Sequence, residues 1–521
     1  MPPRNRLLLV FSLALFAGIV FFARYNGEPG HRLAKVTDRI HLGGLTQNGA
    51  DPGSYDEHLG WIDSYSLNYP IKYARRDIIA TPSANSKRPS VTIVDEPLFK
   101  DFSTIKNISQ PQNIHFDHCL PPLALEVPHV AMPPADASNM IFGLQTTMGR
   151  LKDTVKPLAR WLPHTNARLY AIVIENEETA ADDKEMATLE NEFHSMGMNV
   201  TIIHPVRATD SFPQRYFSLV NIMYEARDHK IEWVVCIDDD TLFPSMDNLL
   251  EMLSRHDSSK PQYIGSLSED WWAVNHYGFM GFGGAGIILS TPLAKTIHEH
   301  NDDCKEHLRM SAGDISVMDC IYQFSDTKLT HITALHQVDM LGDKAGFYEG
   351  GREYLSLHHW KNDPDLHMDM DKAHMVADIC DSCFLQRWQF PNEYLLVNGF
   401  SITHYPQGHL SGKKPGGVLG TGVGGKVEKI NLDQMEETWA QISVTHSLAP
   451  LREKMLPEQK VGYRLLDSIY LDGLPGQRTR GVKQIYVKKG GEGEGDTVIA
   501  LNWHIKAEDS KATPMAPAEQ H

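Results

Sequence analysis

The residues best suited to carry chemistry are Asp238, Asp239 and Asp240, three consecutive carboxylates that directly follow the apolar run 231–237. That run predicts a buried β-strand. Three adjacent carboxylates cannot all ionise comfortably unless a cation neutralises them. In open α/β sheets, ligands bind beyond the carboxyl ends of the strands, which is where this triplet falls. It therefore predicts a metal that bridges the protein to a diphosphate; the alternative is an acidic surface turn.

The direction of each carboxylate follows from the alternation of side chains along an extended segment. Asp238 and Asp240 should point the same way and Asp239 the other way. We expect Asp240 to be a direct metal ligand. Asp238 and Asp239 are expected to contact metal, ribose or nucleotide.

Three later segments could complete such a site. The glycine-rich stretch 278–286 permits close backbone approach to a ligand, and Thr291, which a proline follows, predicts a helix start. Asp314 lies where a loop leads into a helix, a position in which aspartate often caps the helix. His358 and His359 end an apolar segment, and an imidazole could complete a carboxylate metal site.

The segments around these residues alternate between strand and helix patterns over residues 139–385. Expected strands cover 140–144, 168–174, 199–203 and 231–237, and expected helices cover 150–162, 184–196 and 217–229. Such alternation implies βα units, and hence an α/β domain with a mainly parallel sheet covered on both faces.

The flanking regions have a different composition. Residues 25–138 are rich in Pro, Gly, Asn and Asp, which predicts a stem or loosely structured lead-in. Short β-like runs over 386–505 predict a β-rich C-terminal extension, and the polar residues 506–521 predict a disordered tail.

Residues 1–24 combine basic residues with an uncharged, mostly apolar run from Leu7 to Ala23. As a helix this run covers roughly 25 Å, about the shortest length that spans a bilayer. We expect an uncleaved, single-pass membrane anchor; a cleaved signal peptide is the alternative. The rest of the chain would then be luminal, in agreement with sequons at Asn107 and Asn199.

In an oxidising lumen, plausible disulfides join Cys304 to Cys320 and Cys380 to Cys383, although the second pair could instead be half of a zinc site. Cys236 lies inside an apolar strand and is expected to be a buried free thiol. The net charge of -17 and pI near 5.8 argue against nucleic acid as the main partner.

Several motifs occur in a fixed order along residues 139–362. They are Phe142–Thr147, Asp238–Asp240, Gly265–Trp272, Phe282–Gly286 with Leu289-Ser290, Gly313-Asp314 and Leu357–His359. This series resembles the Fringe-like β-1,3-glycosyltransferases of glycosyltransferase family 31, and most of all the fungal Fringe-like group. The C-terminal extension also looks like that of the fungal group.

The resemblance implies a GT-A fold, a UDP-sugar donor, a manganese ion and inversion at the anomeric carbon. By the same resemblance Asp240 and His358, with Asp238, would hold the metal, and Asp314 would be the general base. The expected donor contacts are Thr146, Asp238, Asp239, Gly283, Gly284 and Ala285. The chain has Ala-Gly-Asp where Fringe-type enzymes have Pro-Asp-Asp, and Leu-His-His where they have Phe-His-Ser. The second departure makes His359 an alternative metal ligand.

The expected protein is an inverting, metal-dependent glycosyltransferase of the Golgi membrane. It would move a hexose or N-acetylhexosamine from a UDP-sugar to a glycan or glycoprotein acceptor, forming a β-1,3 linkage. Trp271, Trp272, His276 and Tyr277 would form an aromatic wall for the acceptor, or else belong to the core. The rival hypothesis is a luminal, non-catalytic binding or scaffold protein with the same fold. A metal-dependent hydrolase is disfavoured, because two-metal sites gather more ligands than this region offers.

Overall fold

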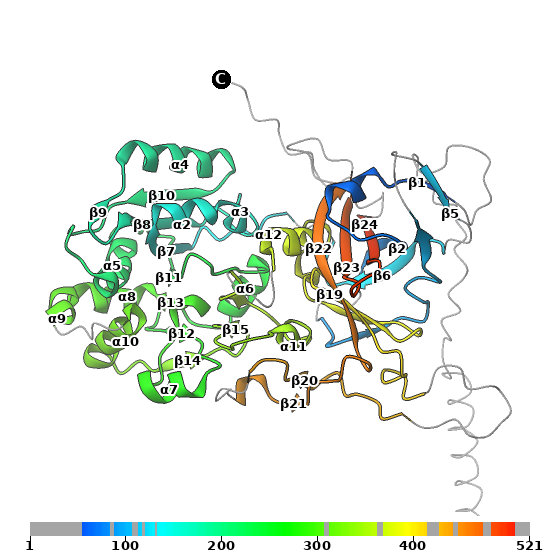
Figure 1. The fold of residues 1–521 in the computed structure, drawn as a ribbon. Helices are drawn as coiled ribbons and strands as arrows, with labels where there is room; N and C mark the ends of the chain where they lie inside the picture. Colours follow the sequence, from blue (N-terminus) through cyan, green and yellow to red (C-terminus); the bar gives the residue numbers. More distant parts are fainter. Residues whose placement is uncertain are drawn as a thin grey trace, which may run out of the picture. The chain divides into compact units, whose positions relative to one another are not determined.

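The computed structural model describes residues 55–83, 88–106, 113–116, 120–130, 133–306, 312–361, 368–413, 427–440, 446–471 and 481–505 (Figure 1). The expected membrane anchor, the sequon at Asn107 and the expected disordered tail lie outside these ranges. Within them, no helix combines the length and the apolar character that crossing a membrane requires.

The first large sheet is eight-stranded and follows the order β10-β8-β7-β11-β13-β12-β14, with β9 paired to β8 (Figure 1). Its strands are β7 (Met140–Thr147), β8 (Arg168–Asn176), β9 (Thr179–Ala180), β10 (Asn199–Ile203), β11 (Trp233–Cys236), β12 (Tyr263–Gly265), β13 (Ile287–Ser290) and β14 (Leu329–His331). Strands β10, β8, β7 and β11 are mutually parallel, whereas β13 runs antiparallel to both β11 and β12. Strands β12 and β14 are again parallel, so the sheet is mixed but mainly parallel, as predicted, with β13 and β9 as the antiparallel strands. The chain reverses at the glycine-rich stretch before β13, which enters between two earlier strands.

Helices cover both faces of this sheet. They are α2 (Met148–Asp153), α3 (Val155–Leu158), α4 (Asp183–Ser195), α5 (Phe212–Glu225), α6 (Met246–Leu253), α7 (Trp271–Tyr277), α8 (Thr291–Glu299), α9 (Asn301–Glu306) and α10 (Gly313–Phe324). Along β7, Met140 and Phe142 belong to the core beneath α2, α3, α4 and α6, and Ile141 belongs to the core beneath α5, α8 and α10. This alternation of apolar side chains is what a strand buried on both faces requires.

Polar side chains fix several helix starts. Thr147 accepts a hydrogen bond from Arg150 N (3.4 Å) at α2, and Asp182 accepts one from Glu185 N (3.0 Å) at α4. Each satisfies a backbone donor that the first turn leaves free. Thr291 is the first residue of α8 and Ser290 is the cap, one position earlier than predicted.

The second large sheet is ten-stranded and follows the order β3-β17-β18-β19-β22-β23-β24-β2-β4, with β6 paired to β2. Its strands are β2 (Ile71–Pro82), β3 (Thr92–Ile93), β4 (Ser103–Ile105), β6 (Leu123–Val127), β17 (Arg387–Gln389), β18 (Tyr394–Val397), β19 (Ser401–His404), β22 (Val461–Leu471), β23 (Gly481–Lys488) and β24 (Thr497–Ile505).

The lead-in therefore belongs to the same sheet as the C-terminal extension. Strand β2, blue in Figure 1, pairs in parallel with β24, red, from Lys72 beside Thr497 to Ala80 beside Ile505. The prediction of a loosely structured lead-in over 25–138 is wrong for these strands. Its error has a physical cause, because the hydrogen-bonding partner of β2 lies more than 400 residues later and leaves no local signal.

Smaller elements complete the described chain. They are the strand pairs β1 (Tyr55–His58) with β5 (Asn113–Phe116), β15 (Leu335–His336) with β16 (Ser356–Leu357), and β20 (Met435–Glu436) with β21 (Leu451–Arg452); the helices α11 (Ala345–Tyr348), α12 (Met370–Ala373) and α13 (Ala377–Cys380); and the 3-10 turns η1 (Gly60–Ser64), η2 (Gly283–Ala285), η3 (His374–Val376), η4 (Asp381–Cys383) and η5 (His446–Leu448).

Both predicted disulfides are present. Cys304 is bonded to Cys320, which ties α9 to α10, and Cys380 is bonded to Cys383. The zinc alternative for the second pair is thereby excluded, since its thiols are bonded to each other. Cys236 is a buried free thiol, as expected.

Candidate active site

The acidic triplet forms a tight turn directly after β11. Ile237 still donates a backbone hydrogen bond to Gly143 of β7 (2.9 Å), so the sheet fixes the start of the turn. Thr241 closes it, because its hydroxyl oxygen accepts from Asp238 N (3.1 Å) and the hydroxyl donates to Gly284 O (2.9 Å). The carboxylates are thus presented at the carboxyl end of a central strand, where sequence reasoning expected them.

A single backbone bridge brings the distant histidine to this turn. Leu242 and Leu357 exchange two backbone hydrogen bonds of 2.9 Å. The next residue, His358, is buried and places its Nε2 atom 3.0 Å from Asp240 Oδ1 and 3.4 Å from Asp238 Oδ2. The three residues predicted to hold a metal therefore converge on one point.

The charges of these groups are strongly coupled. Burial alone would lower the pKa of His358, but the hydrogen bond and charge of Asp240, together with the charge of Asp238, raise the pKa to about 9. Burial raises the pKa of Asp238, and the neighbouring carboxylates add to that effect. Burial also opposes ionisation of Asp240, yet His358 lowers the pKa of this carboxyl group. A protonated imidazole thus compensates both carboxylates in this structure.

The donor set suits a divalent metal, because carboxylate oxygens and one imidazole nitrogen are ligands that manganese accepts. The imidazole nitrogen lies within hydrogen-bonding distance of Asp240, which leaves no room for an ion between them. Accordingly, no group of three or more His, Cys, Asp or Glu side chains in the described part of the chain is already spaced to hold a metal ion. Binding a metal here requires His358 to lose its proton and the three side chains to separate.

Asp239 points the other way, as the alternation of side chains predicts. Its Oδ2 atom accepts from Arg150 Nε at 2.5 Å, and its two oxygens also accept from the Arg150 terminal nitrogen and the Thr146 hydroxyl. Thr146 and Asp239, both expected to contact the donor, are therefore bonded to each other and to the start of α2. Arg150 was not foreseen from the sequence, because a lone arginine in a short helix has no distinguishing pattern.

The predicted contacts Gly283, Gly284 and Ala285 form the buried turn η2. A Cβ atom on Gly284 would lie 2.2 Å from the His358 ring, and one on Gly283 would lie 2.3 Å from the Tyr216 hydroxyl. Close approach is thus needed at both glycines, and in this structure the His358 and Tyr216 side chains make it. Gly284 sets the position of the histidine that faces the triplet.

Asp314 lies in the first turn of α10, where Ala312 is the N-cap residue. Its Oδ2 accepts from Gly283 N (3.3 Å) and its Oδ1 from Ile315 N (2.9 Å). Burial, reinforced by the charge of Asp238, raises the pKa of Asp314 to about 6. Asp314 is therefore coupled to the triplet by charge, although it does not line the cleft that the triplet faces.

His359, the alternative ligand, faces a different group. Its Nδ1 lies 3.0 Å from Asp339 Oδ1, and Asp339 Oδ2 accepts from Ser268 Oγ (2.6 Å). Of the two imidazoles, His358 is the one in contact with the triplet carboxylates.

The carboxylates open onto a cleft of about 470 Å³ at the carboxyl ends of β7, β8 and β11. Cationic side chains also line it: Arg150, Arg215 and Lys361. A phosphorylated ligand in this cleft would therefore face carboxylates as well as cationic side chains.

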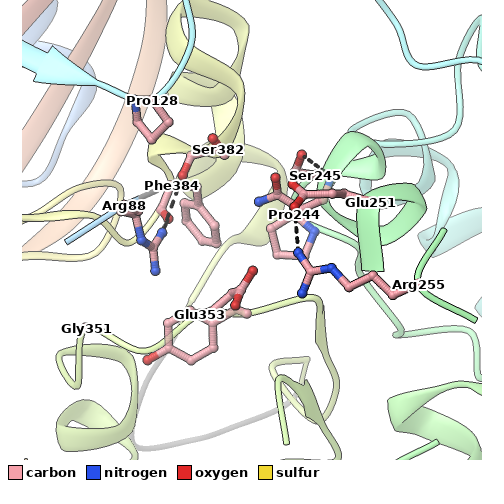
Figure 2. Close-up of a pocket in the computed structure, with 12 residues that line it drawn as sticks. Arg88, Pro128, Pro244, Ser245, Glu251, Arg255, Gly351, Glu353, Ser382 and Phe384 are labelled. Atoms are coloured by element: carbon pink, nitrogen blue, oxygen red, sulfur yellow. Dashed lines mark hydrogen bonds and ion pairs between the residues drawn. The ribbon is translucent and has the colours of Figure 1, made fainter. Parts of the chain in front are cut away.

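A second cavity of about 280 Å³ contrasts with the cleft (Figure 2). Two of its charged groups find partners within its own walls. Arg255 is paired with Glu251 at 2.5 Å, and Arg88 donates to the backbone oxygen of Phe384 at 2.7 Å.

Three of the four aromatic residues of α7 are exposed, whereas Tyr277 is partly buried and packs against the core beside α10. Trp271 and Trp272 are 45% and 55% exposed, and the Trp272 ring stacks on His276 with centroids 4.6 Å apart. The buried side of α7 packs against Ile315 and Met318, so this helix lies beside the start of α10.

Comparisons with known proteins agree with the chemistry of this site. Residues 273–390 match a family described as "Protein of unknown function, DUF604". Chondroitin sulfate synthase 3 of Homo sapiens is 27% identical over 129 residues, which are 23% of this chain and 14% of that protein. Beta-1,3-glucosyltransferase of Mus musculus is 27% identical over 149 residues, which are 28% of this chain and 29% of that protein. Over these segments, the chain is similar to glycosyltransferases.

Each match with these curated relatives spans less than a third of the relative's own length. Among solved structures, the glycosyltransferase GlyE of Streptococcus pneumoniae TIGR4 is similar at 15% identity and a TM-score of 0.29. That alignment covers 43% of this chain and 55% of GlyE.

Proposed function

We propose that this protein is an inverting, metal-dependent glycosyltransferase of the Fringe-like family 31. It would transfer a hexose or N-acetylhexosamine from a UDP-sugar to a glycan or glycoprotein acceptor, forming a β-1,3 linkage. The observation that carries the proposal is the convergence of Asp238, Asp240 and His358 at the end of β11. The similarity to named glycosyltransferases supports the sugar-transfer class.

In this proposal Asp240, His358 and Asp238 hold the divalent cation, manganese by resemblance. When bound, such an ion supplies positive charge to the leaving diphosphate. Asp239 has a structural role in this proposal, because its hydrogen bonds with Arg150 and the Thr146 hydroxyl join the ends of β7 and β11. That pairing keeps the turn rigid when the other two carboxylates change partners.

Asp314 is the proposed general base. The hydroxyl oxygen of the acceptor attacks C1 of the sugar, the bond from C1 to the diphosphate oxygen breaks, and the hydroxyl proton passes to the Asp314 carboxylate. A pKa of about 6 suits this role, because the group is ionised at neutral pH but still basic enough to take a proton. Asp339, in contact with His359, is the second candidate for the base.

The exposed face of α7 is the proposed acceptor wall. Trp271 and Trp272 present apolar ring surface to solvent, and their helix packs on the element that carries Asp314. Aromatic faces bind the apolar faces of sugar rings through the same contacts that pack aromatic side chains.

We also propose that residues 7–23 anchor the chain in the Golgi membrane, with the described residues in the lumen. Two disulfides suit an oxidising compartment, and Asn199 is exposed where its sequon would be modified. Sequencing the N-terminus of purified full-length protein tests this: a start after residue 24 would contradict it.

Donor hydrolysis tests the enzymatic proposal. A panel of UDP-sugars is incubated with the protein, with manganese and with a chelator, and released UDP is measured. Release that requires manganese supports a transferase. A protein that binds UDP but releases none from any donor, with or without an acceptor, would instead be a binding or scaffold module.

A further inference from the structure

Lys361 lies in the cleft, and no side chain in the described structure forms a hydrogen bond or an ion pair with its ammonium group. It lines the cavity with the triplet and follows His358 by three residues. Its Nζ atom is buried and has no hydrogen-bond partner among the residues that the structure describes.

The two arginines of the cleft, in contrast, have partners within the protein. Arg150 is held by both oxygens of Asp239. Arg215 donates to Glu177 at 2.7 Å and to the backbone oxygen of Asp210 at 2.7 Å. These guanidinium groups already have their partners in the protein.

A buried ammonium group without a partner is unfavourable, because it loses hydration and gains no hydrogen bond in return. A buried polar group without a partner calls for an explanation, and in a cleft a ligand can supply the missing partner. A ligand that pairs with Lys361 must be anionic and small enough to enter this cleft.

We propose that Lys361 binds the diphosphate of the nucleotide-sugar donor, an inference that rests on the function proposed above. The ammonium group donates hydrogen bonds to phosphate oxygens and offsets the negative charge that grows on the leaving diphosphate. It complements the cation held by Asp240 and His358, whose charge leaves part of the diphosphate charge unneutralised. No proton or covalent bond is exchanged at Lys361.

The test compares Lys361→Met, which keeps the stem and removes the charge, with Lys361→Arg, which keeps a charge. Lys260→Met is the matched control, because Lys260 forms an exposed pair with Asp257 instead of lining the cleft. Affinity for UDP with manganese and affinity for uridine, which lacks phosphate, are measured on each protein.

We expect Lys361→Met to weaken UDP binding by about 10- to 100-fold, the usual loss for one charge-assisted hydrogen bond. Uridine binding should be unchanged, Lys361→Arg should retain most UDP affinity, and the control should match the wild type. Without UDP, Lys361→Met should unfold at the same or a higher temperature than the wild type, since an unpaired buried charge is gone.

Equal UDP affinity in the wild type and Lys361→Met would overturn the assignment of Lys361. So would a Lys361→Met variant that loses uridine and UDP affinity equally, or that unfolds at a lower temperature, because either result marks a structural lysine. Failure of the wild type to bind UDP with manganese is a different result, and it would overturn the proposed function itself.

Discussion

Replacing Asp314 by asparagine should make the folded protein more stable at neutral pH while making transfer slower. Burial and the charge of Asp238 raise the pKa of this carboxyl group from 3.8 to about 6 in the folded state. The folded state therefore binds the proton more tightly than the unfolded state does. Stability must then fall as pH rises from about 4 to about 6, and it stays lower above that range.

The size of the effect follows from the shift. Two pKa units correspond to about 3 kcal/mol. The side chain retains partial contact with solvent, which screens its charge, so we expect roughly 1–3 kcal/mol. Asparagine removes the ionisation, and the variant should unfold at a temperature about 2–6 °C higher at pH 8, with no gain near pH 4.

Thermal unfolding of both proteins in a chelator, from pH 4 to pH 8, measures this difference. Transfer assays on the same variant should show a rate reduced by about 10²-fold or more, the usual scale for loss of a general base, with UDP affinity retained. Equal or lower stability of Asp314→Asn at pH 8 would refute the electrostatic argument. Wild-type turnover would move the base elsewhere, with Asp339 next to be tested.

Three further predictions concern the metal site, the acceptor and the core. Manganese affinity should rise up to about tenfold per pH unit between pH 7 and 9, because the pKa of His358 is about 9 and its proton must leave on metal binding. Calorimetry in two buffers of different ionisation heat detects that proton, and a pH-independent manganese affinity would contradict the assignment of His358. Replacing Trp271 and Trp272 by alanine should raise the KM for acceptor about tenfold and leave donor hydrolysis unchanged; equal loss of both activities would argue for a structural role. Lys460→Met should lower the free energy of unfolding in urea by about 3 kcal/mol, because Lys460 Nζ lies 2.7 Å from Oε2 of the buried Glu349. An unchanged urea midpoint would show that the other partners of the Glu349 carboxylate suffice.

The sequence predicts those parts of the fold whose signal is local. The strands before the triplet alternate with helices, and their apolar runs mark them as buried, so β7, β8, β10 and β11 were found. The position of the acidic turn after β11 followed from the same pattern. The opposite directions of Asp239 and its neighbours were predicted from the alternation of an extended segment, and they hold although the triplet forms a turn.

Features that depend on distant contacts were missed or misjudged. Strand β2 has its partner at β24, near the other end of the chain, and no nearby residues reveal that pairing. The sequence also gives no sign that Gly284 makes room for His358, which lies more than 70 residues later. Arg150 acquires its role only when folding brings it to Asp239.

Asp238, Asp240 and His358 are proposed to form a metal site that holds the donor diphosphate. Calorimetric titration of UDP into the wild type and into Asp240→Asn, with manganese and with a chelator, tests it most directly. We expect UDP binding that requires manganese in the wild type and is weakened by about 100-fold or more in Asp240→Asn, with unchanged thermal unfolding in the chelator. Unchanged UDP affinity of Asp240→Asn in the presence of manganese would contradict it.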